Sequence, residues 1–268
     1  MTEQAEWVPQ GIDVELPSGA RIYDYLLGGG HNFALDRQLG EQFAAVVPGA
    51  RDIVRINRAF LRRAVLFLVS SGVRQFLDLG SGIPTVGNVH EIAQQADEQA
   101  RVVYVDKEPV AVAHSRLLLE GNERATIVQA DMCEAETILQ APETRRLIDF
   151  DEPVGLLMVA VFHFVPDERR PQEIVAAYRD RLVSGSYLAL SHLTADTMPE
   201  EMAAAVEVSK RMDDQFYLRS REEITALFAG FDLVEPGAVS APLWRPESPA
   251  VGPDAEHSEV FAGVGRRS

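Results

Sequence analysis

The sequence predicts an α/β fold built on a doubly wound, seven-stranded, mostly parallel Rossmann-like sheet with an antiparallel last strand. Two observations predict it. Short apolar runs bounded by turn residues alternate with stretches of helical period between residues 74 and 264. One of these runs, 75–79, passes directly into a Gly-x-Gly turn. Alternation of this kind favours parallel strands joined by helices that cover both faces of the sheet.

The apolar runs and the periodic stretches assign the elements in order. We expect strands at 74–79, 101–106, 125–129, 154–160, 186–192, 231–235 and 258–264. Helices are expected between them at 86–96, 108–120, 134–140, 170–182, 200–213 and 221–229. The last strand follows a proline-rich stretch, so we expect it to form a terminal antiparallel pair at the sheet edge.

An N-terminal helical extension precedes the first strand. Apolar residues at helical spacing predict three helices there, over 19–27, 36–47 and 52–70. The first of them stops at three consecutive glycines, 28–30, which are unusual in a surface turn because of the backbone freedom they retain. We therefore divide the chain into a helical cap or lid, 1–70, and a ligand-binding Rossmann-like domain, 71–268. A glycine-rich hinge suits a lid that closes over a ligand and excludes water.

The turn after the first strand predicts a nucleotide site. Gly80 and Gly82 let the backbone approach a ligand where a Cβ would collide. The next strand ends at Asp106, which is placed to accept two hydrogen bonds from a ribose diol. Together they predict a cofactor that contains adenosine.

The length of this turn helps to choose the cofactor. A dinucleotide fingerprint has a third glycine that opens the helix, whereas this chain has Thr85 three residues after Gly82. The loop continues to Asn88, which with Glu91 forms a predicted capping pair. Such a loop wraps the zwitterionic amino-acid half of S-adenosylmethionine (SAM) better than a pyrophosphate.

Two further strand ends support SAM. Asp131 follows the third strand and can accept a hydrogen bond from the adenine amino group, while Met132 can cover the ring. The fourth strand is fully apolar and ends in the ligand crevice near Val161 and His163. All four features lie at strand carboxyl ends, so a single crevice can contain them.

In this order and spacing the residues resemble the class I SAM-dependent methyltransferases, over about 52–265. The resemblance implies that Asp78, Gly80 and Gly82 contact the methionine part of SAM, Asp106 the ribose and Asp131 the adenine. A narrower resemblance is to an actinobacterial S-adenosyl methyltransferase family, formerly described as a domain of unknown function. It rests on the runs 17–33, 55–63, 76–85, 105–106 and 161–167. It implies the fold, SAM as cofactor and S-adenosylhomocysteine (SAH) as product, but no substrate.

Further cofactor contacts are predicted around these motifs. From the extension we expect Tyr23, Asn32 and Arg58 to reach the cofactor or substrate, with a solubilising surface cap as the alternative. Ser81, in the glycine turn, joins this group. Lys107 follows the ribose-binding acid; it is either a solvated side chain or, in an NADP enzyme, a ligand of the 2′-phosphate.

His163 is the leading candidate for a general base, because a neutral imidazole titrates near the working pH. The alternative is a structural histidine that donates a ring N–H to a nearby carbonyl. His192, at the end of the fifth strand, is the second candidate, and His31 a third. No histidine pair at metal-binding spacing is evident, so we expect no metal.

Three functions are compatible with these motifs. The first is methyl transfer from SAM to a small molecule. The second is SAM binding without transfer, and the third is an NAD(P)-dependent reductase. The missing third glycine and the absence of a Tyr-x-x-x-Lys pair count against the reductase.

Composition narrows the partners. The formal net charge of −16 repels phosphate backbones and anionic membranes, so a nucleic-acid or membrane partner is not expected. An Asn-Pro-Pro-Tyr motif, typical of methylation at exocyclic nitrogens, is absent after the fourth strand. The single cysteine, Cys133, and the lack of a long apolar run or secretory signal indicate a cytoplasmic protein. A homodimer is an open possibility.

Overall fold

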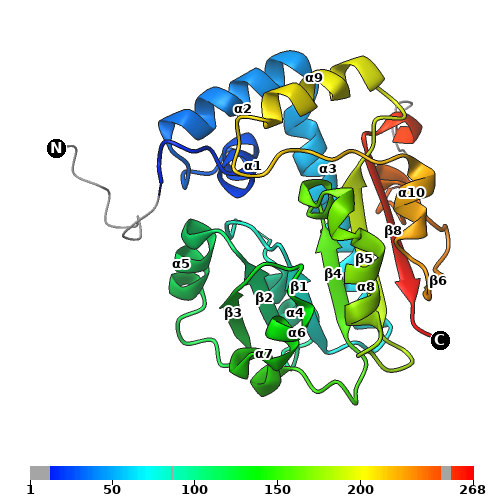
Figure 1. Cartoon of the computed structure of the whole chain (residues 1–268). Coiled ribbons are helices and arrows are strands. Elements are labelled where there is room, and N and C mark those ends of the chain that lie inside the picture. The colour runs from blue at the N-terminus through cyan, green and yellow to red at the C-terminus, as the bar shows by residue number, and fades with distance from the viewer. Residues whose placement is uncertain (1–12, 86, 249–254) are drawn as a thin grey trace.

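The computed structural model describes residues 13–85, 87–248 and 255–268. It is an α/β structure whose eight strands form one sheet in the order β3-β2-β1-β4-β5-β8-β6, with β7 also paired to β8. The strands are β1 (Gln75–Leu79), β2 (Arg101–Asp106), β3 (Ala125–Gln129), β4 (Gly155–Val159), β5 (Tyr187–Leu193), β6 (Asp232–Leu233), β7 (Val239–Ser240) and β8 (Val260–Arg266). Figure 1 shows them with the helices around them.

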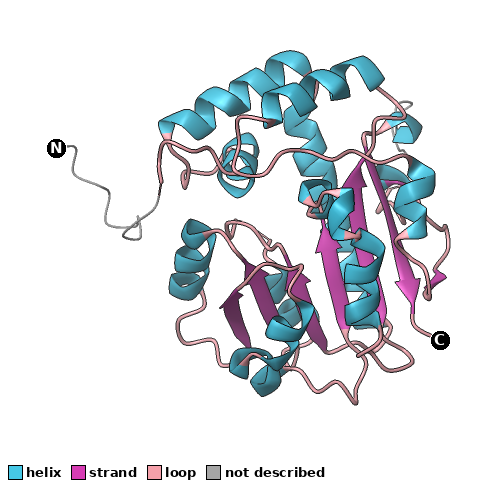
Figure 2. Ribbon diagram, in the orientation of Figure 1, coloured by secondary structure: helices cyan, strands magenta, loops and turns pink. Residues whose placement is uncertain are grey.

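Ten α-helices are found in the described residues. The first three precede the sheet, and the others connect its strands or flank it. They are α1 (Gly19–Leu27), α2 (Ala34–Val46), α3 (Ala50–Ser70), α4 (Val89–Ala96), α5 (Pro109–Leu118), α6 (Ala135–Gln140), α7 (Pro142–Leu147), α8 (Pro171–Arg179), α9 (Pro199–Ser209) and α10 (Arg221–Ala226). Figure 2 shows helices on both sides of the strands, as a doubly wound sheet requires.

Strands β1 to β5 are parallel, and β1 pairs with both β2 and β4. The strand order therefore reverses at β1, where the chain leaves one half of the sheet and begins the other. In open α/β sheets the ligand crevice lies outside the carboxyl ends of the strands at this switch point. The topology thus places a binding site after β1 and β4.

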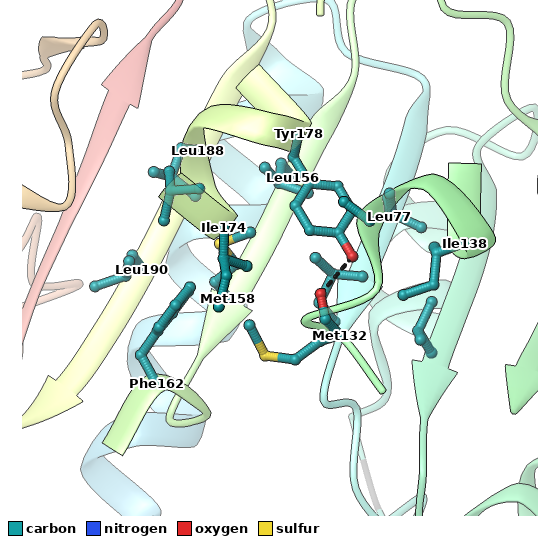
Figure 3. Packing of buried hydrophobic residues seen from close by; sticks show 14 of the residues in the cluster. Leu77, Met132, Ile138, Leu156, Met158, Phe162, Ile174, Tyr178, Leu188 and Leu190 are labelled. Carbon is teal, nitrogen blue, oxygen red and sulfur yellow. Dashed lines mark hydrogen bonds between the residues drawn. The ribbon is translucent and has the colours of Figure 1, made fainter. Parts of the chain in front are cut away.

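Side chains alternate between two buried cores, one on each face of the sheet. On β1, Leu77 joins the core covered by α6, α7 and α8, whereas Phe76 joins the core covered by α3 and α4. Figure 3 shows the first of these cores, in which Tyr178 reaches across to the backbone of Met132. Burial on both faces explains why the parallel strands read as continuous apolar runs.

The N-terminal extension lies over the end of the sheet to which the parallel strands point, with α2 beside α9 (Figure 1). Its own apolar cluster joins α1, α2, α9 and the first turns of α3. Further along α3, the side chains Phe60, Ala64 and Leu68 are fully buried in the core of the sheet. The extension and the sheet therefore share α3.

The sheet departs from the prediction at its C-terminal side. It has eight strands rather than seven, because the expected strand 231–235 is shortened to β6 and a separate strand, β7, follows it. Between β6 and β7, Pro236 lacks a backbone N–H donor and Gly237 turns the chain with φ +93, which interrupts the pairing with β8. The predicted antiparallel last strand is confirmed, and the antiparallel pair of β8 with β6 forms the edge of the sheet, as expected. Helix α7 was not predicted.

Candidate active site

A large cavity opens at the carboxyl ends of β1 to β4 and is covered by α1. Its volume is about 780 Å³, within the usual range for cofactor and substrate sites. The walls are the turn after β1, the ends of β2 and β3, the loop after β4, and the segment that follows α9. The cavity occupies the switch point of the sheet, where the topology places a ligand.

Two glycines in the left-handed region shape the turn after β1. Gly80 has φ +70 and Gly82 has φ +66. A Cβ on Gly80 would lie 2.2 Å from Cγ2 of Val161, so the glycine allows the loop after β4 to approach. Between the two, the Ser81 hydroxyl is buried, lines the cavity and has no hydrogen-bond partner in the described chain. The turn thus offers close backbone approach and an unused polar group to a ligand.

Asp106 fixes this turn from the end of β2. Its Oδ2 accepts the backbone N–H of Gly82 at 2.6 Å, and its Oδ1 accepts that of Glu108 at 2.9 Å. Burial raises the pKa of Asp106, and the two N–H groups partly offset the rise. Each carboxylate oxygen retains a further lone pair, so the side chain can also receive hydrogen bonds from a diol in the cavity that it lines.

Asp78, inside β1, is a second buried carboxyl of the cavity wall. Burial raises its pKa to about 7; Arg58 opposes the rise and the nearby Asp106 adds to it. Arg58 reaches in from α3, and its Nη2 donates to the carbonyl of Gly87 at 2.7 Å. This contact ties the loop that follows the glycine turn to the N-terminal extension.

Asp131 and Met132 follow β3 and line the far end of the cavity. Although burial opposes it, hydrogen bonds from the backbone N–H of Cys133 and from Arg169 lower the pKa of Asp131. Met132 is anchored through its carbonyl, which accepts the Tyr178 hydroxyl at 2.6 Å (Figure 3). Asp131 is therefore an ionised acceptor beside an apolar surface.

Lys107 also lines the cavity, but its ammonium is paired. Nζ lies 2.6 Å from Oδ2 of Asp214, in the segment after α9. The pairing bridges the two sides of the cavity mouth and counts against a 2′-phosphate as the partner of this lysine.

From the extension, Tyr23 reaches the cavity and belongs to a buried polar chain. Its hydroxyl donates to the carbonyl of Val54 and accepts the Asn57 amide at 3.0 Å. Asn57 Oδ1 in turn accepts the Ser191 hydroxyl at 2.6 Å, and Ser191 Oγ accepts the backbone N–H of Ala160. Ala160 has φ +55, so this chain of bonds holds a strained residue at the cavity wall.

Asn32 lies away from the cavity, contrary to the prediction. Its amide donates to Asp24 Oδ2 at 2.8 Å and to the carbonyl of Gly29. Gly28 ends α1 with φ +88, and a Cβ on Gly29 would lie 2.0 Å from Asp24 Oδ1. In this structure the glycine run therefore serves to end α1 and to pack closely on Asp24.

The two histidines predicted as catalytic lie beside the large cavity rather than in its wall. His192 has both ring nitrogens engaged: Nδ1 lies 2.6 Å from the carbonyl of Leu193 and Nε2 lies 2.9 Å from Arg219 Nη1. Burial lowers its pKa to about 3. This geometry favours a structural role. His163 differs, because its buried Nδ1 has no hydrogen-bond partner in the described chain and its pKa lies well below 6.5 owing to burial.

Sequence reasoning missed one buried ion-pair network. Arg21 on α1 contacts Asp36 at 2.9 Å and Glu108 at 2.8 Å, with 3% of its side chain exposed. Glu108, two residues after Asp106, caps α5 by accepting the backbone N–H of Ala111. In the sequence, the one indication that Arg21 is buried was its position next to the apolar Ile22, which lies on the buried face of α1.

Within 13–85, 87–248 and 255–268, no three or more His, Cys, Asp or Glu side chains gather to hold a metal. In the same ranges no helix combines the length and apolarity that a membrane crossing needs.

Comparisons with known proteins agree with this geometry. A candidate methyltransferase from Thermobifida fusca YX is 40% identical, with a TM-score of 0.92 over 98% of this chain and 100% of that one. A DUF574 family protein from Streptomyces avermitilis MA-4680 is 38% identical, with a TM-score of 0.91 over 96% and 99%. The N-methyltransferase NodS from Bradyrhizobium japonicum WM9, 13% identical with a TM-score of 0.50 over 82% and 98%, shares the fold. A search among curated proteins found no match.

The family model described as S-adenosyl methyltransferase matches residues 5–268. Its cofactor fits what the cavity offers: the glycine turn, the unused Ser81 hydroxyl, and the acids Asp106 and Asp131 at successive strand ends. The expected fold, cofactor and enzyme class are thereby confirmed. The chain belongs to the S-adenosyl methyltransferase family and is a SAM-dependent methyltransferase.

Proposed function

We propose that this enzyme methylates a small-molecule acceptor that binds beside the cofactor, under α1. The observation that carries the proposal is the 780 Å³ cavity, which continues from the acidic strand ends to a wall made of α1, α3 and the loop after β4. A covered cavity of this kind admits a metabolite rather than a polymer. The net charge of −16 favours a neutral or cationic acceptor and opposes nucleic acid.

The cofactor roles follow the chemistry of the wall. Asp106 would receive the ribose hydroxyls, and Asp131 with Met132 would contact the adenine. Gly80, Ser81 and Gly82 would hold the methionine half, and Asp78 its ammonium group. Among the other predicted contacts, Tyr23, Arg58, Lys107 and Val161 lie in the wall, whereas Asn32 and His163 do not.

Bound SAM supplies a methyl group on a positively charged sulfur, which is already a good leaving group. The protein's part is to align the acceptor atom in line with that bond and to exclude water. For a hydroxyl acceptor, the oxygen gains the methyl carbon, the C–S electron pair stays on sulfur, and the hydroxyl proton must leave. His163 is the residue we propose to take that proton, because its buried Nδ1 is unused in the described chain. Burial lowers the pKa of His163, so it is a weaker base than an imidazole that titrates near the working pH.

Calorimetric titration with SAM, SAH and NADPH tests the cofactor assignments. We expect micromolar binding of SAM and SAH to the wild type, lost in Asp106→Ala. Asp151→Ala, on an exposed turn, is the matched control and should bind as the wild type does. Preference for NADPH in folded protein would return the reductase alternative. SAM binding without turnover of any metabolite in a broad screen would favour the binding-protein alternative.

Two expectations from the sequence stay predictions. The cytoplasmic location is supported by the single cysteine. The homodimer is open to light scattering coupled to size-exclusion chromatography.

A further inference from the structure

A second, smaller cavity adjoins the cofactor cavity. It lies among α1, α2, α3, α9 and the carboxyl end of β5, and its volume is about 90 Å³. The two cavities have part of their walls in common. The residues that line both are Gly19, Tyr23, Asn57, Ala160, Phe164 and Met212. A molecule in the small cavity is therefore a direct neighbour of a cofactor in the large one.

The wall of the small cavity is apolar and uncharged. Its lining includes Ile22, Val54, Met202 and Ala205, and none of the described residues in it is Asp, Glu, Lys or Arg. Burying a charged group here without a counter-ion would be costly. The cavity thus selects against charged occupants.

One polar atom in this wall is unused. Tyr23, Asn57 and Ser191 satisfy one another or the backbone, and His192 contacts the carbonyl of Leu193 and the Arg219 guanidinium. Nδ1 of His163, by contrast, has no hydrogen-bond partner in the described chain. Because His163 is only 5% exposed, bulk water does not replace that partner. An orphaned buried nitrogen costs stability and asks for an explanation such as a missing ligand.

We propose that the small cavity is the acceptor subsite, and that it takes a compact, neutral, apolar ring bearing one hydrogen-bonding group for His163. The proposal rests on the proposed function and narrows its substrate class. The ring would occupy the apolar wall, and its hydroxyl or ring nitrogen would satisfy Nδ1. The shared wall would present the acceptor to the cofactor.

The size of the cavity sets the size of the occupant. A dry apolar cavity of about 150 Å³ is known to hold benzene, and this one is smaller. Two of its wall residues, Met202 and Met212, are flexible and can shift to admit a ring. We therefore expect a single ring rather than a fused system to fill it.

The test uses phenol and toluene, which have nearly the same shape but differ in one hydroxyl group. Binding to the full-length protein saturated with SAH is followed by NMR, using the methyl resonances of Leu193 and Val54 in the cavity wall. The variants are His163→Phe, which removes the nitrogen, and Ala205→Leu, which fills the cavity from a residue that does not line the cofactor cavity. SAH binding and thermal unfolding of each variant show whether it is folded.

We expect saturable binding of both probes to the wild type. The phenol-to-toluene affinity ratio should fall about 3- to 10-fold in His163→Phe, because the lost hydrogen bond affects phenol alone. Ala205→Leu should weaken both probes and leave SAH binding intact. If Ala205→Leu does not fold, Ala205→Val provides the same test with less added volume.

Two results would overturn the proposal while leaving the methyltransferase function in place. One is SAH binding with no saturable shift at these methyl groups for either probe. The other is an unchanged phenol-to-toluene ratio in folded His163→Phe. Failure of SAH itself to bind would instead refute the cofactor assignments, so the two failures are distinguishable.

Discussion

Asp106 Oδ2 accepts the backbone N–H of Gly82 at 2.6 Å, so the acid that ends β2 also holds the glycine turn that ends β1. The same carboxylate is the proposed ribose ligand. Its two oxygens are therefore engaged before the cofactor arrives, which orients the side chain and reduces the ordering cost of binding.

Asp106→Asn is expected to weaken SAH binding about 10- to 100-fold. The carboxamide has one acceptor oxygen, so it cannot serve both the Gly82 and Glu108 N–H groups, and it lacks the charge that strengthens such bonds. Calorimetry measures the change. Asp151→Asn is the control, and equal SAH affinities in the two variants would show that Asp106 does not contribute to cofactor binding.

Gly80→Ala should disable the site for a steric reason. The added Cβ would lie 2.2 Å from Cγ2 of Val161, at a φ of +70 that alanine tolerates poorly. We expect SAH affinity to fall more than tenfold and Gly80→Ala/Val161→Ala to recover part of it. The remainder reflects the left-handed backbone, about 1–2 kcal/mol. If the double variant bound SAH as weakly as Gly80→Ala alone, the clash with Val161 would not be the cause of the loss.

Cofactor binding should strengthen as pH rises through neutrality. Asp78 has a pKa of about 7, so it is largely neutral at pH 6 and ionised at pH 8. Only the ionised form attracts the ammonium group of SAH. Titrations at pH 6, 7 and 8 should show this rise in the wild type and a flatter profile in Asp78→Asn.

The unliganded enzyme should respond to pH in the opposite sense. The pKa of Asp78 is raised on folding, so the folded state binds more protons than the unfolded chain between about pH 4 and pH 7. Its contribution to the free energy of unfolding is therefore lost as pH rises through that window. The free energy of unfolding, measured by urea titration at several pH values, should fall more steeply with pH in the wild type than in Asp78→Asn between about pH 4 and pH 7. Parallel pH profiles would show that Asp78 titrates normally.

Arg21→Met should be strongly destabilising. The substitution leaves Asp36 and Glu108 buried without their cation, and breaking a buried pair in this way costs about 3–5 kcal/mol. Arg55→Met, which removes an exposed pair with Asp52, should cost under about 1 kcal/mol. Urea unfolding compares the two, and similar losses would mean that the Arg21 network adds little.

The sequence predicted the positions of the glycine turn and of the acids at the strand ends, because a local pattern marks each of them. The glycine turn and the acid at 106 are recognisable because each follows a buried apolar run, and the parallel topology brings such strand ends together. The position of Asp131 was predicted in the same way, from the apolar run that precedes it. These features depend on strand order, which alternation of strands and helices constrains strongly.

Predictions that required a side-chain direction were less successful. Asn32 and the glycines beside it suggested a ligand contact, but the amide serves Asp24 within the same segment. His163 was placed correctly after β4, yet one turn of 3-10 helix carries it into the neighbouring cavity. Arg21 was missed because its partners are 15 and 87 residues away, a separation that no local pattern records.

The shared position of α3 has a consequence for how this enzyme can be cut. A protease that removes the chain before Ala50 would leave the core around Phe60 and Leu68 closed. Cleavage after Ser70 would instead strip a wall from the sheet and expose Phe76 on β1. The core of the sheet therefore needs the chain from about residue 50 onward, so α3 belongs with the sheet, and this boundary lies about twenty residues before the one that the helical pattern predicts.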